Sequence, residues 1–119
     1  MEVEWEDQQR INEFSKLNAR FDANVELKKT YTQEKEDLDD VQMEIELVDE
    51  DEKLMYSIGE TFVYLPQSEI VKRLETKKEE LDAKLEEINT KNSTLEERMS
   101  ELKSVLYARF GNSINLEKD

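Results

Sequence analysis

The sequence predicts a mainly α fold in which two long helices form an antiparallel coiled coil and are joined by a β-hairpin. The first observation is a heptad pattern of apolar residues over 81–106, which needs another helix alongside to become buried. The second is a two-residue turn signal, Gly59-Glu60, between two runs rich in β-branched and aromatic residues. The third is composition: 119 residues with 2 Gly, 1 Pro and 40% charged residues favour a few long elements in a single domain over 1–119.

The first helix is expected over about 6–49. Its apolar residues form a stripe that includes Phe14 and Phe21 and is interrupted by polar residues in the middle. Asp7 either caps the start of this helix or lies in its first turn, where the helix dipole favours anions. The acidic run over 49–52 is interpreted as the end of the helix, because anions are unfavourable at a helix C-terminus.

The β-hairpin is expected over about 53–65. Its turn at Gly59 aligns Tyr56 with Val63 and places alternate side chains on opposite faces. Both faces are largely apolar, and an isolated two-stranded ribbon is only marginally stable in water, so we expect strands from other chains to join it. The candidate residues for subunit assembly are Leu54, Tyr56, Ile58, Phe62, Val63 and Leu65.

The second helix is expected over about 69–110, with Ser68 as its N-cap after Pro66. Gly111 is a C-terminal stop signal, and the remaining residues over 111–119 are expected to form a short mobile tail. One polar residue interrupts an otherwise apolar seam along this helix. The seam consists of Leu81, Leu85, Ile88, Asn92, Leu95, Met99, Leu102 and Leu106.

Antiparallel pairing of the two helices brings the beginning and the end of the chain to one tip of the coiled coil. The same register places Asn24 opposite Asn92, where the pair either specifies the register or lies on the rim. Phe14 and Leu106 are expected to close the tip, while neighbouring apolar residues cannot all face the seam and leave exposed surface. The candidate client-binding residues at this tip are Trp5, Ile11, Phe14, Leu106, Tyr107, Phe110, Ile114 and Leu116.

Composition excludes several classes of function. The net charge of −14 argues against binding to nucleic acid or to an anionic membrane, both of which need Lys and Arg. The chain has no Cys and no His, which removes thiolate chemistry and the commonest general base and metal ligand. No apolar run approaches the roughly 20 residues of a membrane span. We therefore expect a cytoplasmic protein without a catalytic site, a metal or a cofactor.

Three segments carry a resemblance to a known family. Residues 6–14 (EDQQRINEF), 56–62 (YSIGETF) and 106–117 (LYARFGNSINLE) resemble the corresponding parts of β-class subunits of prefoldin, a co-chaperone. The three segments cover about a quarter of the chain, and the last is the most specific. The predicted order of helix, hairpin and helix accounts for the rest.

The resemblance implies a heterohexamer in which this chain joins two α-class and three further β-class subunits. The hairpins would together form an intersubunit β-barrel, with the coiled coils extending from it. The tips would hold unfolded actin and tubulin chains and pass them to the cytosolic group II chaperonin without ATP. The implied location is cytoplasmic, with a nuclear role left open, and the N-terminal arm available for clients is expected to be short.

Other classes of function stay open from the residues alone. A structural coiled-coil adaptor or tethering protein would homodimerise through the seam as parallel helices and would have no need of the hairpin. An acidic histone chaperone or nucleic-acid mimic would depend on clustered charge, so its binding would collapse with salt. An enzyme is disfavoured because nothing in the sequence suggests a cleft that would perturb its carboxylates.

Overall fold

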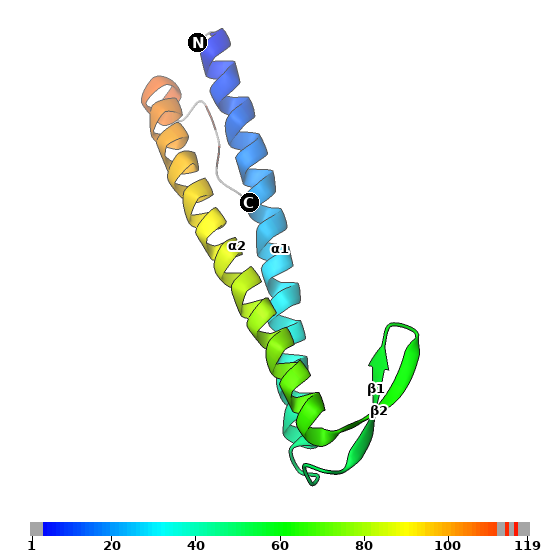
Figure 1. The fold of residues 1–119 in the computed structure, drawn as a ribbon. Coiled ribbons are helices and arrows are strands. Elements are labelled where there is room, and N and C mark those ends of the chain that lie inside the picture. The colour runs from blue at the N-terminus through cyan, green and yellow to red at the C-terminus, as the bar shows by residue number, and fades with distance from the viewer. Residues whose placement is uncertain (1–3, 112–113, 115, 117–119) are drawn as a thin grey trace. The chain divides into compact units, whose positions relative to one another are not determined.

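The computed structural model describes residues 4–111, 114 and 116 of the chain. Two long helices are joined by a two-stranded antiparallel hairpin, which confirms the predicted fold class (Figure 1). The hairpin extends one residue beyond its predicted end, and the second helix begins two residues earlier than predicted. The elements are α1 (Trp5–Ile45), β1 (Lys53–Ile58), β2 (Thr61–Pro66) and α2 (Gln67–Phe110).

The chain divides into two compact units, each of which contains part of both helices. The terminal unit comprises residues 1–27 and 87–119, and the hairpin unit comprises residues 28–86. Each unit has its own contacts between the two helices. Whether they behave as one domain, as the sequence suggests, stays a prediction.

In the terminal unit, the N-terminal part of α1 lies antiparallel to the C-terminal part of α2 (Figure 1). Arg98 donates two hydrogen bonds to the Glu13 carboxylate, from Nε at 2.7 Å and from Nη2 at 2.9 Å. Asn24 donates from Nδ2 to Oδ1 of Asn92 at 2.9 Å. The later position in α1 contacts the earlier position in α2, so the helices run in opposite directions. The asparagine pair expected from the register is confirmed.

The hairpin unit shows the same antiparallel arrangement. Lys35 forms an ion pair with Asp82, and Lys78 forms one with Asp39 at 3.0 Å. The ammonium group of Lys84 lies 5.3 Å from the centre of the Tyr31 ring, a distance at which a cation is attracted to the ring face. Charged side chains thus flank the apolar seam on α1 and α2 in this unit.

α2 provides seven of the eight buried apolar side chains in the described part of the chain, and four of these belong to the heptad seam. Every seam residue is buried or half-buried, and Leu106 is 0% exposed. On α1, Phe14 is the one buried apolar residue among those described, which matches its weaker apolar stripe. The buried apolar side chains are those of Phe14, Ile70, Leu74, Leu81, Ile88, Leu102, Leu106 and Phe110.

The hairpin has the register expected from its turn. Tyr56 pairs with Val63, and the neighbouring pairs are the expected ones along both strands. Gly59 has a φ of 59°, while no described non-glycine residue has a positive φ, so Glu60 has a negative one. This combination is that of a type II′ turn, whose twist matches that of antiparallel strands. Glycine is needed at position 59 because it adopts a positive φ without strain.

The connection between α1 and β1 differs from the prediction. α1 ends at Ile45 rather than near residue 49, because the chain tightens into shorter turns there, with the Val48 N–H donating to the Ile45 carbonyl at 3.2 Å. The side chain of Gln67 also donates to the Ile45 carbonyl, at 3.2 Å. A side chain from the start of α2 therefore satisfies a carbonyl at the end of α1, before the acidic run begins.

The start of α2 is capped by backbone groups rather than by Ser68, which lies inside the helix. The Gln67 N–H donates to the Glu52 carbonyl at 2.8 Å, and the Ser68 N–H donates to the Glu50 carbonyl at 3.3 Å. Helix N-termini leave N–H groups without partners inside the helix, and carbonyls of the preceding loop accept from two of them here. The predicted role of the Ser68 side chain as N-cap is therefore wrong.

Candidate functional site

An apolar groove lies between α1 and α2 in the terminal unit, with a volume of about 520 Å³. We call it the terminal groove. Volumes of this size are ordinary for sites that take small apolar groups. Its lining combines apolar side chains with a few polar and charged ones. The lining residues are Phe14, Asn18, Phe21, Asp22, Val25, Glu96, Met99, Ser100, Lys103 and Leu116.

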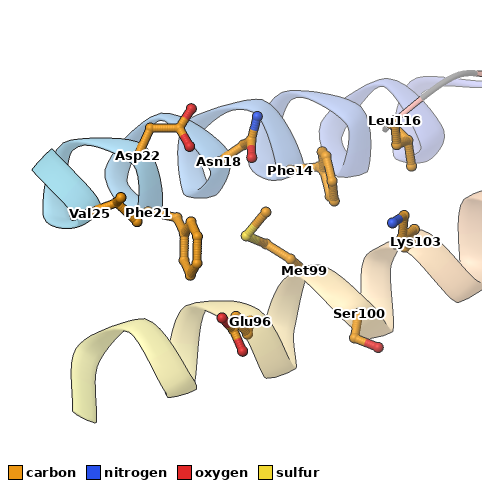
Figure 2. A pocket seen from close by; sticks show the side chains of 10 residues that line it. All are labelled: Phe14, Asn18, Phe21, Asp22, Val25, Glu96, Met99, Ser100, Lys103 and Leu116. Carbon is orange, nitrogen blue, oxygen red and sulfur yellow. The ribbon is translucent and has the colours of Figure 1, made fainter. Parts of the chain in front are cut away.

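The apolar side chains of the terminal groove come from three segments. Figure 2 shows Phe21 of α1 and Met99 of α2 extending toward each other, with Leu116 beside Phe14. Phe21 and Met99 are half-buried, so part of each side chain is accessible from the groove. Met is flexible and polarisable, which suits a surface that packs against groups of different shapes. The groove can therefore receive apolar side chains without a fixed shape requirement.

Leu116 is held against the terminal groove by a hydrogen bond to α2. Its N–H donates to the Tyr107 hydroxyl oxygen at 3.2 Å. α2 ends at Phe110, and Gly111 follows with a φ of 55°, the left-handed conformation with which helices often end. Of the tail over 111–119, only positions 111, 114 and 116 belong to the described residues, so its mobility stays a prediction.

The structure separates the predicted tip residues into three groups. Phe14, Leu106 and Phe110 are at most 7% exposed and hold the helices together. Trp5 is 73% exposed. The remaining members are half-buried, and Leu116 alone among them lines the terminal groove. Contact of any of these residues with a client stays a prediction, and the half-buried members are Ile11, Tyr107, Ile114 and Leu116.

Asp7 forms a buried ionic contact that sequence reasoning missed. Its side chain is 0% exposed and lies 2.8 Å from Nε of Arg109 and 2.9 Å from Nη1 of Arg10. Arg109 also approaches Glu4, at 3.6 Å. Asp7 lies in the first turn of α1, as one of the two predicted alternatives had it. The register that aligns the asparagine pair also aligns Asp7 with Arg109, so this contact could have been predicted from the sequence.

The exposed ion pairs on the two helices do not indicate a catalytic site. The two hydrogen bonds from Arg98 hold the pKa of Glu13 below its ordinary value. Lys91 lowers the pKa of Glu87 in the same way, by donating a hydrogen bond to it. Neither carboxylate is desolvated enough to suggest acid–base chemistry. In the part of the chain that the structure describes, no group of three acidic side chains is arranged to hold a metal ion.

The hairpin provides a second candidate surface, on the face that points away from α2. Met55, Phe62 and Tyr64 are 60%, 65% and 68% exposed. These three residues form what we call the outer face of the hairpin. The Tyr56 ring, on the opposite face, lies 5.4 Å from the cationic groups of both Arg73 and Lys77, so that face packs against α2.

The predicted assembly residues are therefore divided between the two faces. Phe62 belongs to the outer face, and Ile58, at the turn, is 47% exposed. Met55 and Tyr64, which pair with each other on the face opposite Tyr56, were not among the predicted assembly residues. The alternation of strand side chains was the signal that could have selected them. The other predicted residues are half-buried: Leu54, Tyr56, Val63 and Leu65.

An antiparallel coiled coil, a hairpin with one exposed apolar face and an apolar groove between the helices of the terminal unit are typical of coiled-coil proteins that assemble with partners. No helix in residues 4–111 is both long enough and apolar enough to span a membrane. A family model described as "Prefoldin subunit" matches residues 8–113, and the chain belongs to the prefoldin family. Prefoldin subunits are chaperone components that associate with other prefoldin subunits.

Individual relatives agree with the family match and with the resemblance seen in the sequence. Prefoldin subunit 4 of Saccharomyces cerevisiae is 47% identical over 117 residues, which cover 98% of this chain and 91% of that protein. Prefoldin subunit 4 of Homo sapiens is 35% identical over 121 residues, covering 98% and 88%. The crystal structure of the prefoldin beta subunit from Thermococcus strain KS-1 shares the fold, with a TM-score of 0.81, 18% identity and coverage of 91% and 95%.

Proposed function

We propose that this chain is a non-catalytic, ATP-independent co-chaperone subunit of a heterohexameric prefoldin. The complex holds unfolded clients such as actin and tubulin at its coiled-coil tips and delivers them to the cytosolic group II chaperonin. The observation that carries this proposal is the exposed outer face of the hairpin in a member of the prefoldin family. The proposed location is the cytoplasm.

Assembly through the hairpin follows from its exposure and its hydrogen bonding. The described sheet has two strands, so each strand has one edge without a strand partner in this chain. Such an edge can pair with a strand of another subunit, with main-chain hydrogen bonds for affinity and side chains for partner choice. The exposed apolar face formed by Met55, Phe62 and Tyr64 would be buried when several hairpins close into a barrel.

Client holding follows from many weak apolar contacts. The lining surface of the terminal groove is mostly apolar, and the groove is open to solvent. Apolar contact is non-directional, so a groove of this kind recognises exposed hydrophobic surface rather than a specific sequence. Several subunits that engage one client would raise the overall affinity well above that of a single groove. No nucleotide is needed for a process of this kind.

The assembly role is tested by substitution on the outer face. The tagged full chain is expressed in its own cells with Phe62→Asp and Tyr64→Asp together, purified and measured by native mass spectrometry. We expect six subunits for the unsubstituted chain and loss of the other five for the double variant, because charge on this face cannot be buried in a barrel.

A control is Leu47→Asp, which adds one aspartate at a residue that is 87% exposed and lies outside the hairpin. Circular dichroism of both variants reports whether the helices remain. Recovery of all partners with the double variant would refute the platform role. The aggregation of a denatured client, followed with the intact complex and without ATP, tests the holding role separately.

A further inference from the structure

We propose that Tyr107 is a positioning residue that fixes Leu116 as the third wall of the terminal groove, and that this completed groove binds a non-helical apolar segment of an unfolded polypeptide. The inference rests on the proposed client-holding function and specifies where and how one subunit contributes to it. It assigns one role to the Tyr107 hydroxyl, which positions the wall, and another to Leu116, which forms it.

The first support is the position of Leu116 itself. It is half-buried, lines the terminal groove and belongs to neither a helix nor a strand. An aliphatic side chain carried by a non-helical backbone therefore already contacts this groove. An unfolded client presents the same chemistry, because its apolar side chains extend from a backbone without regular hydrogen bonding. Leu116 thus indicates which kind of group the groove accepts.

The second support is the hydrogen bond between Leu116 and Tyr107. The Leu116 N–H donates to the Tyr107 hydroxyl oxygen, and the Tyr107 side chain is anchored on α2. Ordering a chain segment costs conformational entropy, which a segment fixed in advance does not lose again when the ligand binds. The hydroxyl therefore pre-organises the wall, although Tyr107 itself does not line the groove.

The third support is the unfilled volume beside Leu116. About 520 Å³ remains within the terminal groove when Leu116 is in place, so this residue bounds the site without filling it. Phe21 and Met99 face each other across this space (Figure 2). Asn18 and Ser100 also line the groove and can hydrogen-bond to the main chain of a bound segment. The lining therefore provides both apolar contact and partners for backbone polar groups.

The test uses the assembled complex in which only this chain carries methionines labelled with ¹³C at the methyl group. The probe is a short disordered peptide with leucine side chains, and a peptide with serine at the same positions is its control. The Met99 methyl resonance reports occupation of the groove, and that of Met55, on the hairpin, is an internal reference. We expect the leucine peptide to shift the Met99 resonance and to leave that of Met55 unchanged.

Tyr107→Phe removes the hydroxyl and keeps the ring, so it separates positioning from packing. We expect this substitution to lower the affinity of the groove for the leucine peptide about three- to tenfold, which is the effect of one lost hydrogen bond. Leu116→Ala should lower this affinity at least as much, because it removes apolar contact area from the groove lining. Tyr31→Phe is the matched control: it makes the same chemical change at a half-buried residue of the hairpin unit and should leave binding unchanged. Helicity and subunit composition should be the same in all variants.

Three results would overturn the inference. Unchanged affinity in Tyr107→Phe and Leu116→Ala would show that the wall does not contribute. Tighter binding in Leu116→Ala would show that Leu116 blocks the groove rather than completing it. An unmoved Met99 resonance in the unsubstituted complex would place the peptide elsewhere. Each of these leaves the proposed function intact if the complex still suppresses aggregation of a denatured client, whereas failure of that assay refutes the proposed function itself.

Discussion

Removal of the charge on Asp7 should destabilise the terminal unit by more than removal of a comparable charge at an exposed position. Asp7 is 0% exposed and accepts hydrogen bonds from Arg109 at 2.8 Å and from Arg10 at 2.9 Å. It also lies in the first turn of α1, where a negative charge interacts favourably with the helix dipole. Asp7→Asn keeps the size of the side chain and removes its charge.

The expected loss in the free energy of unfolding depends on which interactions Asp7→Asn removes and which remain. A hydrogen bond to a charged group contributes about 1.5–3 kcal/mol, and the interaction with the dipole adds about 0.3–1 kcal/mol. The side chains of Arg109 and Arg10 are 43% and 38% exposed, so water can partly replace the lost carboxylate. We therefore expect Asp7→Asn to lower the free energy of unfolding by about 2–3 kcal/mol, less than the loss from an uncompensated charge in a dry interior.

The assay is urea unfolding of the full chain followed by circular dichroism, with Asp82→Asn as the control. Asp82 also forms an ion pair between the two helices, but its side chain is 54% exposed, so its replacement should cost less than about 1 kcal/mol. Combining Asp7→Asn with Arg109→Gln should cost less than the sum of the single substitutions, because both remove the same contact.

Equal costs for Asp7→Asn and Asp82→Asn would refute this reasoning, because burial would then have no influence on the strength of the ion pair. Strict additivity of Asp7→Asn and Arg109→Gln would also count against it. In that case the two residues would be close in space without being energetically coupled.

Two further predictions concern single residues of the terminal unit. Leu106→Ala should lower the free energy of unfolding by about 3 kcal/mol, because Leu106 is fully buried, whereas Val105→Ala, at a residue that is 40% exposed, should cost less than about 1 kcal/mol in the same urea experiment. Arg98 lowers the pKa of Glu13 in the folded chain, so this carboxylate stabilises the fold above its unfolded pKa of about 4.5 and loses that contribution as the pH falls through the lower folded value. The difference in stability between the unsubstituted chain and Glu13→Gln should be small at pH 7 and should vanish in acid, and a difference that grows in acid would contradict the assignment.

Much of the fold could be predicted because its elements have simple periods. The heptad seam of α2 identified the buried side of a long helix, and alternation around Gly59 identified both strands and their register. The end of α1 and the start of α2 were harder to predict, because contacts distant in sequence determine them. A side chain at Gln67 satisfies the carbonyl of Ile45, and loop carbonyls replace the expected Ser68 cap.

The candidate site was only partly predictable. Sequence reasoning brought the apolar residues of both chain ends together, but it could not separate Leu106, which is fully buried, from Leu116, which lines the groove. That distinction depends on how the chain reverses after Gly111 and on the bond to Tyr107. On the hairpin, apolar residues on both faces concealed which face α2 covers.

The links between the hairpin and its surroundings have a mechanical consequence. The Tyr56 ring lies against Arg73 and Lys77 of α2, and the first N–H groups of that helix are bonded to carbonyls of the segment leading into β1. Tension on the strands is therefore transmitted directly to the first turn of α2. A small change in the twist of the β-hairpin therefore changes the direction of the first turns of α2.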